Sequence, residues 1–321
     1  MIRSGRTESW HRGSLVVLDA SGQVLASAGV IDLPMFPRSS NKPMQAAAML
    51  GCGLDLADDR LLALAAASHS GEEFHIAGVR EILSSAGLGT SDLQCPPDLP
   101  IDDEAKAELL GSGGKRDRVH MNCSGKHAAM LATCVAAGWP TASYRDPDHP
   151  LQRRIKATIE RLAAEPVAAI GVDGCGAPLM ALTLTGLARA FATVVRSPAG
   201  SAESRVADAM RGHPTWMSGT RRYEATLMRA VPGMLMKPGA DGVCAFALAD
   251  GRAAAIKIDD GAQRAVAPVM AALLRELVAA EPGQGAPSKR IDVEVLAELA
   301  HGPVLGGGQP VGEVRAILPG R

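Results

Sequence analysis

Aromatic side chains are scarce in this 321-residue chain, where Phe, Tyr and Trp together make up 3% of the residues. Proteins that bind single-stranded nucleic acids stack the bases on aromatic rings, and this chain has few rings to offer. It also lacks an excess of positive charge, because 33 Lys and Arg are balanced by 34 Asp and Glu, for a net charge of -1. Binding to nucleic acid depends on neutralising phosphates. We therefore expect no nucleic-acid partner.

Long apolar runs are missing as well. No stretch approaches the roughly 18 uninterrupted apolar residues that indicate a membrane span, and the first eight residues do not read as an export signal. The six cysteines (Cys52, Cys95, Cys123, Cys134, Cys175 and Cys244) are scattered, with no C-x-x-C pair. These absences favour a cytoplasmic protein whose cysteines are thiols or metal ligands rather than a disulfide framework.

Apolar residues nevertheless make up 47% of the chain, enough for a sizeable core. Residues 14–29 and 242–258 each read as a β-hairpin, and 311–318 as a last short strand. Most of the chain between the hairpins has helical character. This order predicts an α+β fold in which the two ends of the chain share one antiparallel sheet. The first helix that we expect starts near Ser40 or Asn41 and continues to Leu50. The other expected helices cover 61–67, 73–86, 128–137, 151–164, 179–192, 203–211, 220–230 and 266–279.

The run R-S-S-N-K-P at 38–43 places a hydroxyl and an amine three residues apart, just before an Ala-rich helix. A serine hydroxyl becomes a good nucleophile when a neighbouring base removes its proton, and a neutral lysine is such a base. Ser39 and Lys42 are therefore candidates for an S-x-x-K active centre. In the simpler interpretation, Ser39, Ser40 or Asn41 caps the helix and Lys42 is a surface charge.

Two other polar loops contain closely spaced thiols. Cys123 lies three residues before Lys126 in N-C-S-G-K-H, and Asp173 lies two before Cys175 in D-G-C-G. Two thiolates and a carboxylate form a plausible zinc set with room for a fourth ligand, although a lysine binds metal only as the neutral amine. On spacing alone the cysteines are more often small buried residues.

Two histidines, His69 and His127, directly follow candidate residues in these loops. A lone histidine is more often a hydrogen-bonded structural residue than a catalyst, so both are secondary candidates. Short loops of the same polar character, S-H-S-G-E at 68–72 and K-P-G-A-D-G at 237–242, complete the set. Such loops at the ends of apolar elements are where catalytic residues usually lie.

Taken in order along the chain, these motifs resemble those of the asparaginase II family, which includes the inducible rhizobial-type L-asparaginases. The resemblance runs from R-S-G and E-S near the start through R-S-S-N-K-P, S-H-S-G-E-x-x-H, N-C-S-G-K-H, D-H-P, D-G-C-G and K-x-G-A-D-G-V to G-G-x-x-V-G. It covers nearly the whole chain. It implies hydrolysis of L-asparagine to aspartate and ammonia, and a fold similar to the serine β-lactamases and glutaminases. It also implies a single catalytic domain over 1–321, with a sheet from about 1–40 and 230–321 and a helical portion from about 41–230.

The resemblance also assigns roles to residues. It places the nucleophile on Ser39 with Lys42 as its partner, and a second serine–lysine pair on Ser68 and Lys237. It implies a zinc ion that organises the substrate pocket rather than activating water, and a homodimer. The implied zinc ligands are Cys123, Lys126, Asp173 and Cys175. The implied substrate-binding residues are Arg38, His69 and His127.

Two alternatives stay open at this stage. The same serine–lysine chemistry suits another small-amide hydrolase or a β-lactam hydrolase. A non-catalytic, zinc-stabilised binding domain could also retain the fold, although such a domain has no need for paired hydroxyls and amines. The asparaginase interpretation requires the side chains of Ser39, Lys42, Ser68 and Lys237 to share one pocket.

Overall fold

The computed structural model describes residues 1–279 and 291–318 of the chain. The chain forms two compact units. The first, here called the sheet unit, comprises Met1–Ser40, Leu182–Arg196 and Thr226–Arg321. The second, the helical unit, comprises Asn41–Ala181 and Ser197–Ala225.

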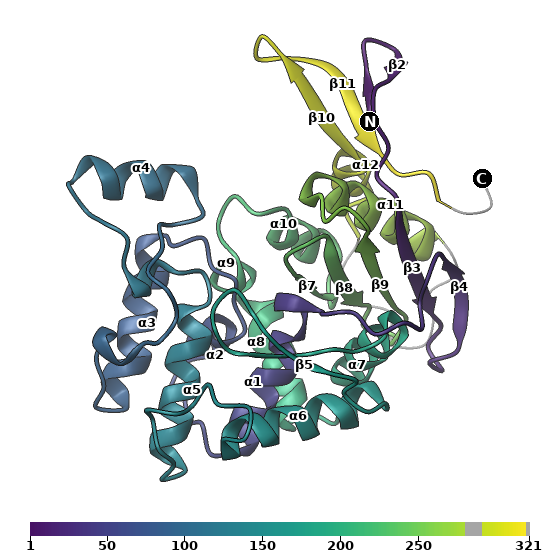
Figure 1. The fold of residues 1–321 in the computed structure, drawn as a ribbon. Helices are drawn as coiled ribbons and strands as arrows, with labels where there is room; N and C mark the ends of the chain where they lie inside the picture. The colour runs from purple at the N-terminus through teal and green to yellow at the C-terminus, as the bar shows by residue number, and fades with distance from the viewer. Residues whose placement is uncertain (280–290, 319–321) are drawn as a thin grey trace. The chain divides into compact units, whose positions relative to one another are not determined.

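The sheet unit is built around a five-stranded antiparallel sheet of order β4-β3-β9-β8-β7. Through β3, the first hairpin therefore pairs with a strand that lies more than 200 residues later, β9, and Leu15 is opposite Ile256. Figure 1 shows β3, β8 and β9 side by side. The strands of this sheet are β3 (Gly13–Leu18), β4 (Val24–Ala28), β7 (Leu235–Pro238), β8 (Val243–Ala247) and β9 (Ala253–Ile258).

Every residue of β8 is buried, so side chains on both faces of this strand are covered. Helices α7 (Leu184–Arg196) and α11 (Val266–Ala279) both pack on β8 and β9. Half of the residues of β9 are alanine, and small side chains let a helix backbone approach the sheet closely. In a chain with few aromatic residues, this close packing takes the place of large rings in the core.

A second sheet in the same unit also joins the two ends of the chain. Its order is β10-β11-β1-β2, and Ile2 of β1 is opposite Glu313 of β11. Helix α12 (Val293–Leu299) leads into it and contacts α11. The strands of this sheet are β1 (Ile2–Arg3), β2 (Arg6–Thr7), β10 (His301–Gly306) and β11 (Gln309–Arg315).

The helical unit is organised around α1 (Lys42–Gly51), nearly all of whose residues are buried. Pro43 occupies the first turn of α1, where its missing N–H has no helical partner to lose. Helices α2, α5, α6 and α8 pack against α1. The other helices are α2 (Asp59–Ala65), α3 (Glu73–Ser85), α4 (Asp103–Gly111), α5 (Ser124–Ala136), α6 (Pro150–Ala163), α8 (Ala202–Gly212) and α9 (Pro214–Met217).

Shorter elements complete the described chain. A two-stranded ribbon of β5 (Ile170–Val172) and β6 (Pro178–Met180) carries a turn at 173–177. Helix α10 (Tyr223–Ala230) spans the sequence boundary between the two units. Four 3-10 turns lie at η1 (Arg38–Asn41), η2 (Thr90–Asp92), η3 (Arg118–His120) and η4 (Gln263–Ala265).

The α+β fold class with an antiparallel sheet from both chain ends is confirmed, as are both hairpins. Three details of the expectation are wrong. The expected helix 128–137 begins earlier, at Ser124, and the expected helix 179–192 is instead strand β6 followed by α7. The last strand belongs to the second sheet rather than to the first. Residues 281–287, whose Pro and Gly residues indicate a loop, lie outside the described residues. The single-domain assignment stays a prediction.

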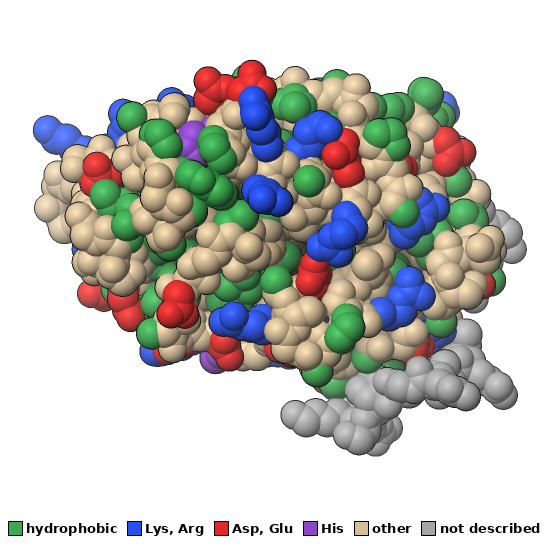
Figure 2. All heavy atoms as spheres, turned by 90° about the horizontal axis from the view of Figure 1, so that it is seen from below, with side chains coloured by type: hydrophobic (Ala, Val, Ile, Leu, Met, Phe, Trp, Pro, Cys, Tyr) green, Lys and Arg blue, Asp and Glu red, His purple; other side chains and the backbone are tan. Residues whose placement is uncertain are grey.

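No helix in the described part of the chain is both long and apolar enough to cross a membrane. The surface shown in Figure 2 carries basic and acidic side chains interspersed with one another. This mixture agrees with the near-zero net charge of the sequence.

Candidate active site

A loop that follows α2 is held in place by backbone hydrogen bonds to two distant segments of the helical unit. The N–H of Ser68 donates to the carbonyl of Met217 at 3.2 Å, and the N–H of His69 donates to that of Asn122 at 3.0 Å. The next N–H, of Ser70, donates to Ser218 at 2.7 Å. The loop is thereby fixed in position without belonging to a helix or sheet.

Lys42, in the first turn of α1, reaches this loop. Its side chain is 1% exposed, and its Nζ contacts the carbonyl oxygen of Ala67 at 2.5 Å and the Oγ of Ser68 at 3.0 Å. It also lies 3.1 Å from the Sγ of Cys123. The structure therefore brings together an amine, a hydroxyl and a thiol that are far apart in the sequence, and Lys42 is not a surface charge.

Cys123 directly precedes α5, and the start of this helix lies against α2. A Cβ added at Gly125 would lie 2.5 Å from the carbonyl oxygen of Leu64, so only glycine allows so close an approach. This approach places Cys123 and Lys126 in the buried interior of the helical unit. The sequence pattern predicted a loop here because its residues are polar, although all of those in the first turn of α5 are buried.

The second thiol, Cys175, lies in the turn between β5 and β6. Its Sγ is 3.1 Å from the Nζ of Lys126 and 3.6 Å from the Oδ2 of Asp173, and it shares a hydrogen bond with Cys123. The four residues predicted as metal ligands therefore lie in one region of the helical unit. Among the described residues, however, no group of three or more His, Cys, Asp or Glu side chains has the arrangement of a metal site.

The two thiols differ in protonation. The hydrogen bond from Cys123 and the charge of Lys126 lower the pKa of Cys175 to about 5, against the effect of burial. The pKa of Cys123 rises to about 12 because of its bond to Cys175 and its burial. Burial alone would lower the pKa of Lys126, but the neighbouring thiols and Asp173 raise it above its usual value. A thiolate and an ammonium ion therefore pair in this interior.

This electron-rich set of donors suits a dication. Two sulfurs, an amine and a carboxylate are ligand types that zinc accepts, and the stabilised thiolate of Cys175 is already in the ligating form. Binding would require Lys126 and Cys123 to lose their protons, as is general for metal ligands. The residues fit the ion chemically, and zinc binding stays a prediction.

Both histidines predicted as substrate-binding residues are buried in the same unit. The Nδ1 of His127 lies 2.6 Å from the hydroxyl of Tyr144, and the Nε2 of His69 lies 2.8 Å from the Oγ of Ser124. Burial lowers the pKa of each imidazole well below its ordinary value, so both rings are neutral near pH 7. Neither Tyr144 nor Ser124 was among the residues that the sequence predicted for the site. Tyr144 is one of two tyrosines in the chain, and that rarity was the available signal.

The other predicted site residues belong to the sheet unit. Lys237 on β7 is fully buried, and its Nζ donates to the carbonyl of Pro238 at 3.0 Å. The carbonyl of Lys237 accepts a 3.0 Å hydrogen bond from Ser40. Ser39 is partly exposed in η1. The buried serine of the R-S-S-N-K-P run is thus Ser40, and its hydroxyl holds η1 to β7.

Arg38 forms an ion pair with Asp241 in the same unit. Both residues have a left-handed backbone, with φ of 51° and 54°. A non-glycine residue adopts this conformation at an energetic cost, and such residues gather at functional sites. The turn after β7 and the turn before α1 are therefore held together by two strained residues.

The structure thus forms two groups of predicted site residues. In the helical unit, Lys42 and Ser68 lie with the four predicted metal ligands and the two histidines. In the sheet unit, Arg38, Ser39 and Lys237 lie in or next to η1 and β7. Whether the two groups share one pocket, as the sequence analysis predicts, stays a prediction.

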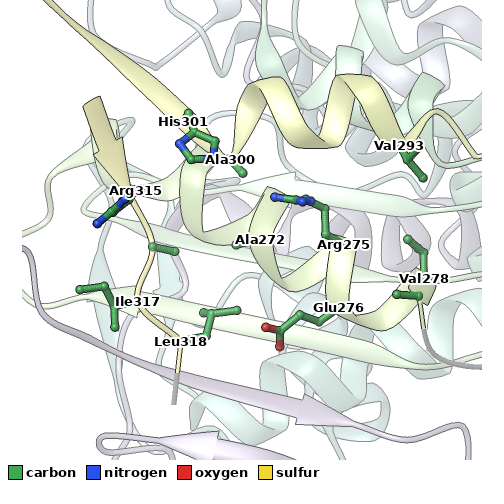
Figure 3. A pocket seen from close by; sticks show the side chains of 12 residues that line it. Ala272, Arg275, Glu276, Val278, Val293, Ala300, His301, Arg315, Ile317 and Leu318 are labelled. Carbon is green, nitrogen blue, oxygen red and sulfur yellow. The ribbon is translucent and has the colours of Figure 1, made fainter. Parts of the chain in front are cut away.

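A cavity of about 770 Å³ lies elsewhere in the sheet unit (Figure 3). Side chains of α11, of the segment around His301 and of the residues after β11 line it. None of the predicted site residues is among its described lining. It is therefore separate from the candidate active site.

The sequence profile of the family described as L-asparaginase II matches residues 1–316, which is almost the entire chain. The chain belongs to the L-asparaginase II family. Membership identifies this asparaginase II protein as a hydrolase acting on amides, with a small-molecule amide as its substrate class. A search of curated proteins found no match to it.

Several solved structures show a weak likeness to this L-asparaginase II family member. A β-lactamase from Mycobacterium bovis is 16% identical with a TM-score of 0.41, covering 78% of this chain and 88% of its own. The hydrolase EstCE1, described as having promiscuous acyltransferase activity, is 14% identical with a TM-score of 0.41, covering 78% and 90%. Mglu, in a structure determined in 4.3 M NaCl, is 15% identical with a TM-score of 0.42, covering 78% and 56%. These low TM-scores carry no argument about the chemistry of this chain.

Proposed function

We propose that this protein is an L-asparaginase that hydrolyses L-asparagine to L-aspartate and ammonia through a serine nucleophile. Membership in the amide-hydrolysing family supports the reaction class. The observation that carries the proposal is the buried amine of Lys42, whose Nζ lies 3.0 Å from the hydroxyl of Ser68. Burying a lysine is costly unless its hydrogen bonds are satisfied, and such groups cluster at functional sites.

In the proposed reaction, the Oγ of Ser39 attacks the carbon of the side-chain amide. Lys42 accepts the proton of the serine hydroxyl, and the proton then passes to the leaving nitrogen, so that ammonia departs and an acyl-enzyme ester remains. Water adds to the ester, its proton returns to Ser39, and aspartate is released. N–H groups at the start of α1 are suited to stabilise the oxyanion that forms in each step.

The contacts of Lys42 suggest how it exchanges its proton. As an ammonium ion it can donate to all three of its neighbours, but as a neutral amine it has two hydrogens and needs one neighbour to donate to it. The carbonyl of Ala67 cannot donate, whereas the hydroxyl of Ser68 and the thiol of Cys123 can. If Cys123 binds metal it has no proton to give. Ser68 is then the remaining group that can donate a hydrogen to the neutral amine of Lys42, and we assign it the role of proton relay. Lys237 is assigned as the second amine of the site.

A zinc ion is part of the proposal. Cys123, Lys126, Asp173 and Cys175 would hold it, and its positive charge would help to bind and orient an anionic group of the substrate. Arg38 is proposed as a second cationic group that binds the substrate carboxylate. His69 and His127 are proposed as neutral groups that form hydrogen bonds with the substrate. We further propose that the protein works as a homodimer.

The decisive experiment measures ammonia release from L-asparagine and L-glutamine by the wild-type protein and two neighbouring serine variants. We expect Ser39→Ala to lower kcat by at least about 10³-fold because the nucleophile is lost. Ser40→Ala should keep most of the activity and lose about 1 kcal/mol of stability, because its hydroxyl makes a buried hydrogen bond.

The results can also contradict the proposal. Wild-type ammonia release by Ser39→Ala would exclude Ser39 as the nucleophile. Turnover of a β-lactam or another small amide, without turnover of asparagine, would replace the substrate. Binding of labelled asparagine without ammonia release would favour a non-catalytic binding domain.

A further inference from the structure

Two of the four buried histidines described in the helical unit, His127 and His69, each have one ring nitrogen bonded to a hydroxyl and one without a described partner. His127 and His69 are both fully buried. Among the described residues, the Nε2 of His127 and the Nδ1 of His69 have no hydrogen-bond partner. Buried polar atoms are nearly always paired. The Nδ1 atoms of His75 and His120 lack a described partner as well, but only His127 and His69 are among the predicted substrate-binding residues, so their two nitrogens are the positions at which we expect a ligand atom.

The tautomer of His127 follows from the partners of Tyr144. The phenol oxygen accepts a 3.1 Å hydrogen bond from the backbone N–H of Gln94 and lies 2.6 Å from the Nδ1 of His127. A phenol has one hydrogen. If the Nδ1 of His127 carried a hydrogen, the oxygen would receive two donors and the phenol hydrogen would have no described acceptor. The phenol therefore donates to Nδ1, and the hydrogen of the imidazole lies on Nε2.

The tautomer of His69 follows in the same way from Ser124. The hydroxyl of Ser124 donates its single hydrogen to the carbonyl of Val119 at 2.8 Å. Its oxygen can then only accept from the Nε2 of His69, 2.8 Å away. His69 consequently carries its hydrogen on Nε2 and presents a lone pair on Nδ1.

We infer that Tyr144 and Ser124 are positioning residues that give the two histidines opposite roles toward the substrate. His127 presents a fixed N–H donor, and His69 presents a fixed acceptor. A ligand that suits both has a carboxylate or amide oxygen for the donor and an ammonium or amide N–H for the acceptor. The identity of that ligand as a free amino acid rests on the proposed function, whereas the two tautomers do not.

Nitrogen NMR of the imidazole rings tests the tautomers directly. In protein with ¹⁵N-labelled histidine, long-range proton–nitrogen spectra should show a protonated Nε2 and an unprotonated Nδ1 for both His127 and His69. The signals of each ring are assigned by their disappearance from the spectrum of the His127→Gln or His69→Gln variant. A protonated Nδ1 in His127 would overturn the role of Tyr144, and a protonated Nδ1 in His69 would overturn that of Ser124.

Two conservative variants act as controls for each other. Tyr144→Phe should move the Nδ1 signal of His127 and leave His69 unchanged, and Ser124→Ala should move the Nε2 signal of His69 and leave His127 unchanged. His149 is an internal standard, because its Nδ1 accepts from the N–H of Leu151 and its Nε2 donates to the carbonyl of Pro140. Unmoved signals in either variant would overturn the corresponding contact.

Kinetics test the role toward the substrate. In Tyr144→Phe we expect KM for L-asparagine to rise about tenfold, the equivalent of one lost neutral hydrogen bond, with a smaller change in kcat. An unchanged KM, together with a moved His127 signal, would overturn the binding role while the tautomer stands. If the wild-type protein releases no ammonia from asparagine, the proposed function fails, and the NMR result still decides the tautomers.

Discussion

His75 shows how a single buried residue makes the stability of this protein depend on pH. It stacks near His69 with a 5.2 Å separation of ring centroids and lies beside Phe74 and Trp216. Its Nε2 donates to the carbonyl of Thr215 at 3.0 Å. Burial lowers the pKa of His75 from 6.5 to about 4, so the folded protein keeps the ring neutral.

We predict that part of the free energy of unfolding is lost as the pH falls from about 6.5 to 4. In this window the unfolded chain binds a proton on His75 and the folded chain does not, so protonation favours unfolding. The loss due to His75 is at most about 3 kcal/mol for a shift of this size. The stability contributed by the neutral ring is fully present above pH 6.5. Urea unfolding at a series of pH values measures how the free energy of unfolding changes across this window.

The variant His75→Gln isolates this contribution from that of the other histidines. Its amide can still donate to Thr215 but does not titrate, so its stability should fall less steeply between pH 6.5 and 4. If the free energy of unfolding fell equally with pH in the wild type and the variant, the pKa of His75 would not be lowered in the folded protein.

At the scale of single elements, helix α6 ends in a strained residue. Ala164, which follows α6, has a left-handed backbone with φ of 52°, and it is exposed. This position favours glycine, because a Cβ makes the left-handed conformation costly.

We predict that Ala164→Gly raises the free energy of unfolding by about 0.5–1 kcal/mol, since relief of strain exceeds the added flexibility of the unfolded chain. Ala157→Gly, at an exposed position inside the same helix, is the matched control and should lower it by about 1 kcal/mol. Equal effects of the two substitutions on the urea midpoint would contradict the assignment of the helix end.

The helices and strands that the sequence predicted well have clear patterns of apolar and turn residues within their own segments. Both long hairpins and α11 follow from alternation, turn residues and helical spacing. The two-residue strand β1 escaped prediction because it pairs with β11 at the other end of the chain. Strand β2 is equally short and pairs with β1, and β10 contains Gly302, Pro303 and Gly306, which weaken a strand pattern. The start of α5 was missed because Lys126 and His127 are polar residues that tertiary contacts bury.

The sequence predicted only part of the candidate site, because some of its residues are defined by contacts that form in the folded chain. Residue patterns singled out Lys42 and the two thiols, and the resemblance added Ser68. The structure places these residues together in the helical unit. Neither the patterns nor the resemblance could identify Tyr144 or Ser124, because their roles depend on which ring nitrogen each hydroxyl contacts. That information is absent from spacing along the chain.

At the scale of the whole molecule, the buried ionic cluster predicts a metal requirement. Purified protein should contain about one zinc per chain by elemental analysis, and removal by a chelator should lower Tm because a bound ligand stabilises the folded state. Cys123→Ser and Cys175→Ser should each lose most of the metal, since each removes a sulfur ligand.

Cys52 supplies the matched control for the metal. It is a partly buried cysteine at the end of α1, outside the thiol cluster, and Cys52→Ser should retain zinc. Metal-free protein after mild purification, or full zinc content in Cys175→Ser, would contradict the predicted ligand set.

Because β3 pairs with β9, this part of the sheet can form only after most of the chain has been synthesised. Gly13 is opposite Ile258, about 245 residues later, and a ribosome that adds about 5–20 residues per second needs about 12–50 s to cover that distance. Throughout this interval β3 can pair with β4 on one side, but its other side lacks β9, while most of the helical unit has already been translated. The nascent chain therefore offers a chaperone an early, long-lived binding segment at residues 14–18.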